Sequence, residues 1–278
     1  MKVVTYDAGT GPRVGRVDDG QVLDVGFDGD MVAFIAAGAP VRGERPVDSA
    51  HLLAPLRPRT MRDYLSFRGH MENALGRLGL PIPEEWYEIP SYYKGMPDTV
   101  IGPDAEIPWP SYTDKLDHEL ELAAVVGKPG RDIPPERALE HVFGWTIWND
   151  LSARDVQARE LKLGLGPAKG KDWDGSNVLG PCIATADELD ASDLRMTVRV
   201  NGEVWGEDSS ANMHHTFADL IAYASLAQTL HSGEVLGSGT AAGGSGLELD
   251  RWLQPGDEVE LEIEGIGILR NRIGTKGA

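Results

Sequence analysis

The chain has 278 residues and a formal net charge of −18, because 44 Asp and Glu residues outnumber 26 Lys and Arg residues. Phosphate backbones and anionic lipids bind clustered basic side chains, so this composition disfavours nucleic-acid and membrane partners. The single cysteine, Cys182, excludes an internal disulfide and a cysteine-based zinc cluster. No apolar run reaches the roughly 20 residues of a membrane span, and the first residues lack the apolar core of a signal peptide. We expect a soluble, cytoplasmic, globular protein.

The first 60 residues are predicted to form a small unit of short strands. Alternating apolar pieces lie at 3–6, 13–17 and 21–25 and are separated by Gly and Asp turns. A short helix is predicted over 31–37, and the Pro- and Arg-rich residues 39–60 are predicted to be a linker. We therefore divide the chain into two parts. These are a small β-rich N-terminal domain, residues 1–58, and a larger domain, residues 59–278.

The larger part is also richer in strands than in helices. Strands are predicted over 116–127, 194–200 and 258–264, and helices over 134–142 and 217–230. Strands and helices do not alternate regularly, and neither GxGxxG after a strand nor GxxxxGK[ST] occurs. These features disfavour a nucleotide-binding βαβ sheet. The pattern predicts an α+β fold that is mainly β.

A pair of glutamates gives the first indication of chemistry. Glu119 and Glu121 lie two residues apart in a predicted strand, so both side chains project from the same face. Neighbouring buried anions persist only with a cation or protons between them. Together with Asp150 they form an all-oxygen set that suits Mg²⁺, with Mn²⁺ or Ca²⁺ as alternatives. A solvated acidic strand face is the other interpretation, although the flanking Leu120 and Leu122 favour a buried strand.

Five stretches of the chain resemble, in order, the fumarylacetoacetate hydrolase family. They are LDHELELAAVVG from residue 116, GWTIWNDLSARDVQ from 144, GPAKGKDWDGSNVLGP from 166, LGSGTAAGGSGLEL from 236 and PGDEVELEIEGIGILRNRI from 255. The resemblance implies a mixed β-sandwich roll of the family's C-terminal type, preceded by a small β-rich N-terminal domain. It also implies a divalent cation and a homodimer. The family includes C–C hydrolases, decarboxylases, isomerases and hydratases, so membership leaves the reaction open.

The same resemblance implies roles for individual residues by motif position. The metal ligands that it implies are Glu119, Glu121, Asp150 and Asp63. The catalytic group that it implies comprises His70 as general base, Glu248 as the carboxylate that orients it, and Lys171 as an oxyanion donor. The substrate contacts that it implies are Arg154, Gln157, Tyr93 and Thr240. Each of these residues alone has an ordinary structural interpretation, such as a packing histidine or a surface ion pair, and the ordered set carries the assignment.

The chain departs from the family pattern at two positions. Leu65 stands where the hydrolases proper often have a tyrosine, with Tyr64 beside it. Asn73 stands three residues after His70, where the smaller acylpyruvate-cleaving members have a glutamate. The pairing of His70 with Glu248 therefore fits better. Residues 64–98, which carry His70 and several prolines, are expected to pack loosely as a lid over the substrate.

The expected reaction is cleavage of a C–C bond in a small 1,3-dioxo acid, of the acylpyruvate or fumarylacetoacetate type, in aromatic or sugar-acid catabolism. His70 would take a proton from water, and Lys171 and Gln157 would stabilise the resulting oxyanion. One alternative is a 2-oxo acid decarboxylase, isomerase or hydratase that uses the same metal site. The other is a metal-bearing scaffold without catalysis, against which the intact His70 and Glu248 argue.

Overall fold

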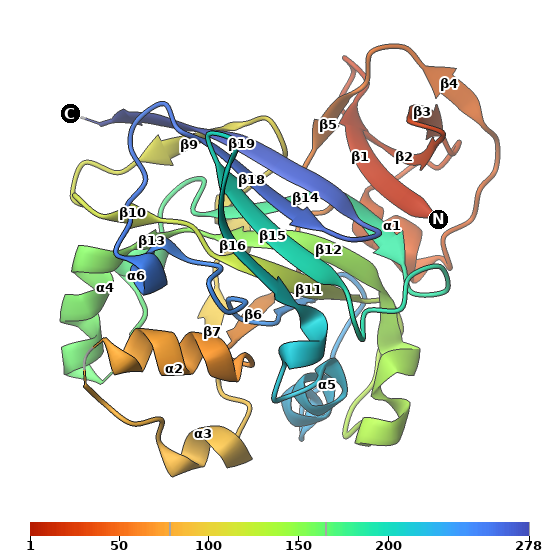
Figure 1. Ribbon diagram of the computed structural model, residues 1–278. Helices are drawn as coiled ribbons and strands as arrows, with labels where there is room; N and C mark the ends of the chain where they lie inside the picture. The colour runs from red at the N-terminus through yellow and green to blue at the C-terminus, as the bar shows by residue number, and fades with distance from the viewer. Residues whose placement is uncertain (78, 165, 278) are drawn as a thin grey trace.

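The computed structural model describes residues 1–77, 79–164 and 166–277, and most of its regular structure is strand (Figure 1). The larger sheet has twelve strands. They are β1 (Lys2–Asp7), β2 (Pro12–Asp18), β3 (Gln21–Asp24), β4 (Arg45–Val47), β5 (His51–Leu53), β6 (Met61–Tyr64), β7 (Tyr92–Gly95), β8 (Val100–Ile101), β11 (Leu120–Val126), β12 (Val142–Asp150), β14 (Asn177–Thr185) and β17 (Val235–Gly237). Their order is β4-β3-β2-β1-β14-β12-β11-β17-β6-β7, with β5 paired to β1 and β8 to β14.

A second sheet of five strands lies across β11, β12 and β14 (Figure 1). In spatial order its strands are β16 (Glu203–Ser209), β15 (Arg195–Val200), β18 (Glu258–Ile263), β19 (Gly267–Lys276) and β9 (Glu106–Trp109). Every residue of β11 is buried, because both faces of this strand are covered. Leu122 packs in the core that includes Val198 and Leu261 of the second sheet. Ala123, on the opposite face, packs in the core that includes Phe34 near the N-terminus.

Short helices cover the edges and ends of the sheets. The α-helices are α1 (Met31–Ala36), α2 (Arg68–Gly76), α3 (Glu84–Glu88), α4 (Arg154–Glu160), α5 (Phe217–Ser225) and α6 (Gly246–Leu249). The 3₁₀ helices are η1 (Pro97–Thr99), η2 (Pro135–His141), η3 (Leu161–Leu163), η4 (Lys169–Lys171) and η5 (Ser210–Asn212). α5 begins with a capping box, in which Thr216 and Asp219 bond each other's backbone amides. None of the helices in the described ranges is long and apolar enough to cross a membrane.

The fold class is confirmed as α+β and mainly β, and the structure corrects several predicted elements. The helix predicted over 134–142 is present as a 3₁₀ helix over 135–141 and needs no correction. The helix predicted over 217–230 ends at Ser225, because Ala227 adopts a left-handed φ of 55° that cannot continue it. Residues 39–60 are more than a linker, since β4 and β5 lie within them and pair with β3 and β1.

The strand predicted over 116–127 is broken at residues 118 and 119. Its first part, β10 (Leu116–Asp117), pairs with β13 (Ser152–Ala153) in a separate two-stranded sheet. Glu119 forms an isolated bridge with Ser245, and β11 begins after it. The break turns Asp117 away from the sheet that carries Glu121.

The N-terminal strands are joined to the large sheet through β1. This strand pairs with β2 on one side and with β14 on the other. Apolar residues of the first segment, such as Val3 and Phe34, share a core with Leu179 and Ile183 of β14. We retain the division at residue 58 as a proposal, because β1 to β5 pair largely with one another.

Candidate functional site

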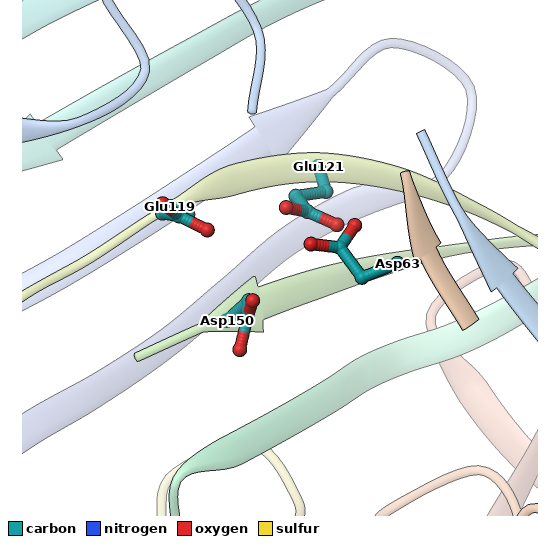
Figure 2. Close-up of side chains that lie close together, drawn as sticks. All are labelled: Asp63, Glu119, Glu121 and Asp150. Atoms are coloured by element: carbon teal, nitrogen blue, oxygen red, sulfur yellow. The ribbon is translucent and has the colours of Figure 1, made fainter. Parts of the chain in front are cut away.

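Four carboxylates from separate parts of the chain point toward one another (Figure 2). Asp63 lies on β6, Glu121 on β11, Asp150 at the end of β12, and Glu119 at the strand break. One oxygen from each lies within 4.8 Å of the others, and none of the four residues is more than 4% exposed. β17 brings two of the contributing strands together, because it pairs in parallel with β6 and antiparallel with β11. The structure thus brings together the four predicted metal ligands.

The chemistry of this cluster fits a hard divalent cation. Both oxygens of Glu121, and one each of Asp63 and Asp150, are buried without a hydrogen-bond partner among the described residues. Burial and the neighbouring carboxylates raise the pKa of Asp63 and of Glu121 well above the usual range. Burial is also the main reason that the pKa of Asp150 is about 6. Buried, unpartnered anions are costly, and coordination to Mg²⁺ or Mn²⁺ would remove that cost.

Two basic side chains contact the cluster. The Lys171 ammonium lies 2.6 Å from a Glu119 oxygen and also pairs with Asp150. Arg154 Nη2 donates to the other Glu119 oxygen at 2.7 Å. Burial opposes ionisation of Glu119, but the charges of Lys171 and Arg154 outweigh it and hold its pKa below the usual range. The predicted oxyanion donor Lys171 and the predicted substrate contact Arg154 therefore contact carboxylates of the cluster in this structure.

The other predicted substrate contacts lie around the same cluster. The Tyr93 hydroxyl donates to Asp150 Oδ2 at 2.7 Å. Gln157, on the first turns of α4, accepts a hydrogen bond from Arg154 Nη1 at 2.9 Å. Thr240 is 2% exposed in the segment that follows β17. Tyr93 thus contacts a carboxylate of the cluster directly, and Gln157 is linked to Glu119 through Arg154.

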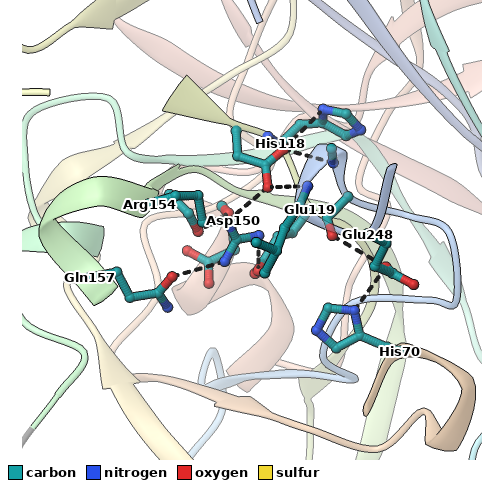
Figure 3. A network of polar contacts seen from close by, with 12 residues as sticks. His70, His118, Glu119, Asp150, Arg154, Gln157 and Glu248 are labelled. Carbon is teal, nitrogen blue, oxygen red and sulfur yellow. Dashed lines mark hydrogen bonds and ion pairs between the residues drawn. The ribbon is translucent and has the colours of Figure 1, made fainter. Parts of the chain in front are cut away.

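His70 and Glu248 form a hydrogen-bonded pair (Figure 3). His70 Nδ1 lies 2.8 Å from Glu248 Oε1, and both residues are buried. The other carboxylate oxygen accepts from Asn73 Nδ2 at 2.7 Å and from the Gly243 amide at 2.8 Å. Burial favours the neutral acid, but the hydrogen bonds and charge of its partners hold the pKa of Glu248 below its usual range. Because Glu248 binds Nδ1, Nε2 is the ring nitrogen left to exchange a proton.

Sequence reasoning missed part of this arrangement. In the sequence Asn73 stands out only as a departure from a family pattern, yet its side-chain amide donates to Glu248 and holds it in place. Asp117, which binds Arg154 Nε at 2.7 Å, was not singled out although it lies in the most recognisable motif. The Tyr64 hydroxyl donates to the Leu220 carbonyl in the core, and Leu65 is 44% exposed. Tyr64 therefore does not supply the hydroxyl that Leu65 lacks.

Trp86 anchors one part of the segment that is predicted to be a lid. Trp86 on α3 is buried, and its indole nitrogen donates to the Leu65 carbonyl at 2.7 Å. The ring stacks on His214 with centroids 4.9 Å apart, and His215 bonds the Trp86 carbonyl. These contacts hold α3 against the residues that precede α5.

A mixed β fold with buried carboxylates beside a histidine–glutamate pair defines a class of metal-site enzymes, and the comparisons specify the family. The family described as Fumarylacetoacetate (FAA) hydrolase C-terminal matches residues 59–274. The chain belongs to this family.

Similar proteins carry several activities in their names. A fumarylacetoacetate hydrolase from Exiguobacterium antarcticum is 30% identical, with a TM-score of 0.84 and coverage of 99% of both chains. A 5-carboxymethyl-2-hydroxymuconate delta-isomerase from Mycobacterium smegmatis is 28% identical, with a TM-score of 0.81 and full coverage of both. A human mitochondrial oxaloacetate tautomerase is 36% identical over 196 residues, which is 70% of this chain and 60% of that protein.

Proposed function

We propose that this protein is a divalent-metal-dependent hydrolase that cleaves a C–C bond in a small 1,3-dioxo acid of the acylpyruvate or fumarylacetoacetate type. The observation that carries the proposal is the buried His70–Glu248 pair beside the four-carboxylate cluster. A purely structural metal site would have no use for an oriented base. The similarity to the E. antarcticum hydrolase over nearly the full length of both chains supports the same assignment.

The residues around the cluster can each carry out a different part of such a reaction. Asp63, Glu119, Glu121 and Asp150 would hold Mg²⁺, or Mn²⁺ or Ca²⁺ in its place. When bound, the cation would act as a Lewis acid on the carbonyl oxygens of the substrate. The residues of the chain itself would position the substrate and move the proton.

His70 is the proposed general base. Its Nε2 takes a proton from the attacking water, while Glu248 fixes the tautomer and stabilises the imidazolium that forms. The Lys171 ammonium is the proposed oxyanion donor, together with the Gln157 amide. The proton held on His70 then passes to the carbon leaving group.

The remaining residues are proposed to position the substrate. Tyr93 contacts Asp150, Thr240 is buried in the segment after β17, and both are proposed to contact the oxygens of the bound acid. Arg154 already bonds Asp117, Glu119 and Gln157, so its proposed contribution is to hold Glu119 and Gln157 in place.

An isomerase or tautomerase of a 2-oxo acid is the second candidate. It is favoured by the similarity to the oxaloacetate tautomerase and to the delta-isomerase. The same His70 could move a proton between carbon and oxygen of an enolisable acid without consuming water.

A reaction panel in H₂¹⁸O distinguishes the candidates. Fumarylacetoacetate, an acylpyruvate and oxaloacetate would each be incubated with the Mg²⁺-loaded protein, with products identified by mass spectrometry and keto–enol interconversion followed by ultraviolet absorbance. A hydrolase yields two fragments, with ¹⁸O in the newly formed carboxylate. Interconversion of keto and enol forms without cleavage would favour the second candidate. Release of CO₂ without a labelled acid would exclude the first.

We further propose that the protein acts in the cytoplasm as a homodimer, on a small oxo acid and not on nucleic acid or membranes. The cytoplasmic location is supported by the single cysteine, because a chain with one cysteine has no internal disulfide that would require an oxidising compartment. Cys182 is buried, and burial raises the pKa of its thiol to about 11, so the thiol stays protonated and unreactive.

A further inference from the structure

We propose that Asp117 is a positioning residue that fixes the metal-site carboxylate Glu119 and the His70–Glu248 pair relative to one another. The proposal rests on the metal site of the proposed function and assigns a role to a residue outside it. Asp117 is 0% exposed and touches neither the carboxylate cluster nor His70 in any hydrogen bond among the described residues.

Asp117 accepts hydrogen bonds from two separate parts of the site. Its Oδ1 accepts from the Gly246 amide at 2.7 Å, and its Oδ2 accepts from the Leu247 amide at 3.0 Å. Its Oδ2 also accepts from Arg154 Nε at 2.7 Å. A buried carboxylate with both oxygens bonded is held in one orientation, and it holds its donors in turn.

The hydrogen bond from Arg154 links Asp117 to the metal-site carboxylate Glu119. The Arg154 guanidinium is planar, so fixing Nε on Asp117 also fixes the direction of Nη1 and Nη2. Nη2 donates to Glu119 Oε1 at 2.7 Å, and Nη1 donates to Gln157 (Figure 3). The orientation of Glu119 therefore depends on Asp117 through one rigid group.

The hydrogen bonds from the amides of α6 link Asp117 to the residue that orients the general base. Gly246 and Leu247 are the first two residues of α6, and Glu248 follows them directly. A Cβ on Gly246 would lie 2.7 Å from Asp117 Oδ1 and 2.0 Å from the Arg251 carbonyl, so the backbone can approach this closely only with glycine. By holding these amides, Asp117 sets the position from which Glu248 reaches His70 Nδ1.

The strand break explains how Asp117 can accept hydrogen bonds from both Arg154 and α6. In an unbroken strand Asp117 would lie on the same face as Glu119 and Glu121 and would add a further anion to the cluster. Instead β10 pairs with β13, with Asp117 opposite Ser152, two residues before Arg154. The carboxylate is thereby turned to Arg154 and to α6.

The test compares Asp117→Asn with Asp24→Asn. Asp24 is a matched control, because it is 4% exposed and accepts from Arg13 Nε at 2.6 Å and from the Gly26 amide at 2.7 Å in the N-terminal strands. Titration calorimetry would measure Mn²⁺ affinity, and hydrogen exchange would follow the amides of 246–249. We expect Asp117→Asn to weaken Mn²⁺ binding by about 10-fold or more and to speed exchange in α6. Asp24→Asn should change neither by more than about twofold.

A measurement on the wild-type protein covers the case in which Asp117→Asn does not fold. Saturating Mn²⁺ should slow exchange of the Gly246 and Leu247 amides more than exchange of the Gly26 amide. Equal effects on both sets of amides, or a folded Asp117→Asn variant with wild-type Mn²⁺ affinity and α6 exchange, would overturn the proposal. A wild-type protein that binds no Mn²⁺ would instead refute the proposed function.

Discussion

At the scale of single residues, the four carboxylates of the cluster differ in charge because they have different neighbours. Glu119 faces two cations, Lys171 and Arg154, and its pKa is lowered. Glu121 faces other acids, and burial with that repulsion raises its pKa. One cluster therefore contains both an anchored anion and an acid that favours its proton.

Metal binding should consequently depend on pH. The pKa of Asp150 is about 6, and those of Asp63 and Glu121 are also raised, so protons compete with the cation as pH falls. We expect Mn²⁺ affinity to increase from about pH 5 to about pH 7, with net release of protons on binding. Calorimetry in buffers of different ionisation enthalpy measures both. An affinity that is constant across this range would contradict the assignment of these acids as ligands.

Substitutions in the His70–Glu248 pair and in the carboxylate cluster should have different effects on turnover and on metal binding. Glu248→Gln should leave Mn²⁺ affinity unchanged and lower kcat by roughly 10²-fold or more, since it removes the acceptor that orients His70. Glu119→Gln and Asp150→Asn, each with loss of one ligand charge, should weaken Mn²⁺ binding. Calorimetry and steady-state kinetics on the three variants provide the comparison. An equal loss of Mn²⁺ affinity in all three variants would contradict the assignment of Glu248 as the residue that orients His70.

Single residues also show where sequence reasoning stops. The spacing of Glu119 and Glu121 predicts that their side chains share a face, whereas Asp150 is assigned beside them through its residue type and the family resemblance. The contacts of Asp117 could not be predicted, because they depend on amides 129 and 130 residues further along the chain. The pairing of Lys171 and Arg154 with carboxylates likewise follows from the fold and not from any local pattern.

At the scale of elements, the position of α2 decides whether His70 meets Glu248. Asn73 on α2 binds the Glu248 carboxylate, and Arg77, which follows α2, donates to the Glu248 carbonyl at 3.0 Å. A Cβ on Gly69 would lie 2.7 Å from the Ala242 Cβ, so the start of α2 packs directly on the segment that precedes α6.

Gly69→Ala should therefore displace α2 and lower turnover. We expect kcat to fall while Mn²⁺ affinity stays at the wild-type value, because the metal-site carboxylates lie on other elements. The double variant Gly69→Ala, Ala242→Gly removes the clashing Cβ on the opposite side and should restore most of the activity. Failure of the second substitution to restore turnover would show that the contact does not set the position of α2.

The elements themselves were predictable where the periodicity was simple. β18 alternates buried and half-buried residues along its length, as its sequence pattern indicated. The break at His118 was not predictable from the apolar run, because it results from pairing of β10 with β13. The 3₁₀ geometry of η2 was not predictable either, since the proline at its start is equally compatible with an α-helix.

At the scale of the whole molecule, the N-terminal strands and the larger part are joined by one sheet and by shared apolar cores. β1 pairs with β14, and the core beneath α1 includes Val125 and Leu179 of the large sheet. We expect a single cooperative thermal transition, since neither part can lose its structure without exposing the other's apolar side chains. Calorimetry would detect two separate transitions if residues 1–58 unfolded independently.

The proposed homodimer gives a second expectation at this scale. It comes from the family, and exposed apolar side chains such as Leu139 at 54% and Leu226 at 61% offer surface that a partner could cover. Multi-angle light scattering should give twice the chain mass of 30.1 kDa. A particle with the mass of one chain at working concentrations would refute the dimer.

The parallel pairing of β17 with β6 has a consequence for how this site can vary among relatives. Gly237 lies opposite Asp63, and a Cβ there would be 2.6 Å from Glu121 Oε2 and equally close to the Trp148 ring. The space for the longer acid thus comes from a missing methyl group on the adjacent strand. In relatives with the same strand order, a residue larger than glycine at this position should co-vary with a shorter acid at position 121.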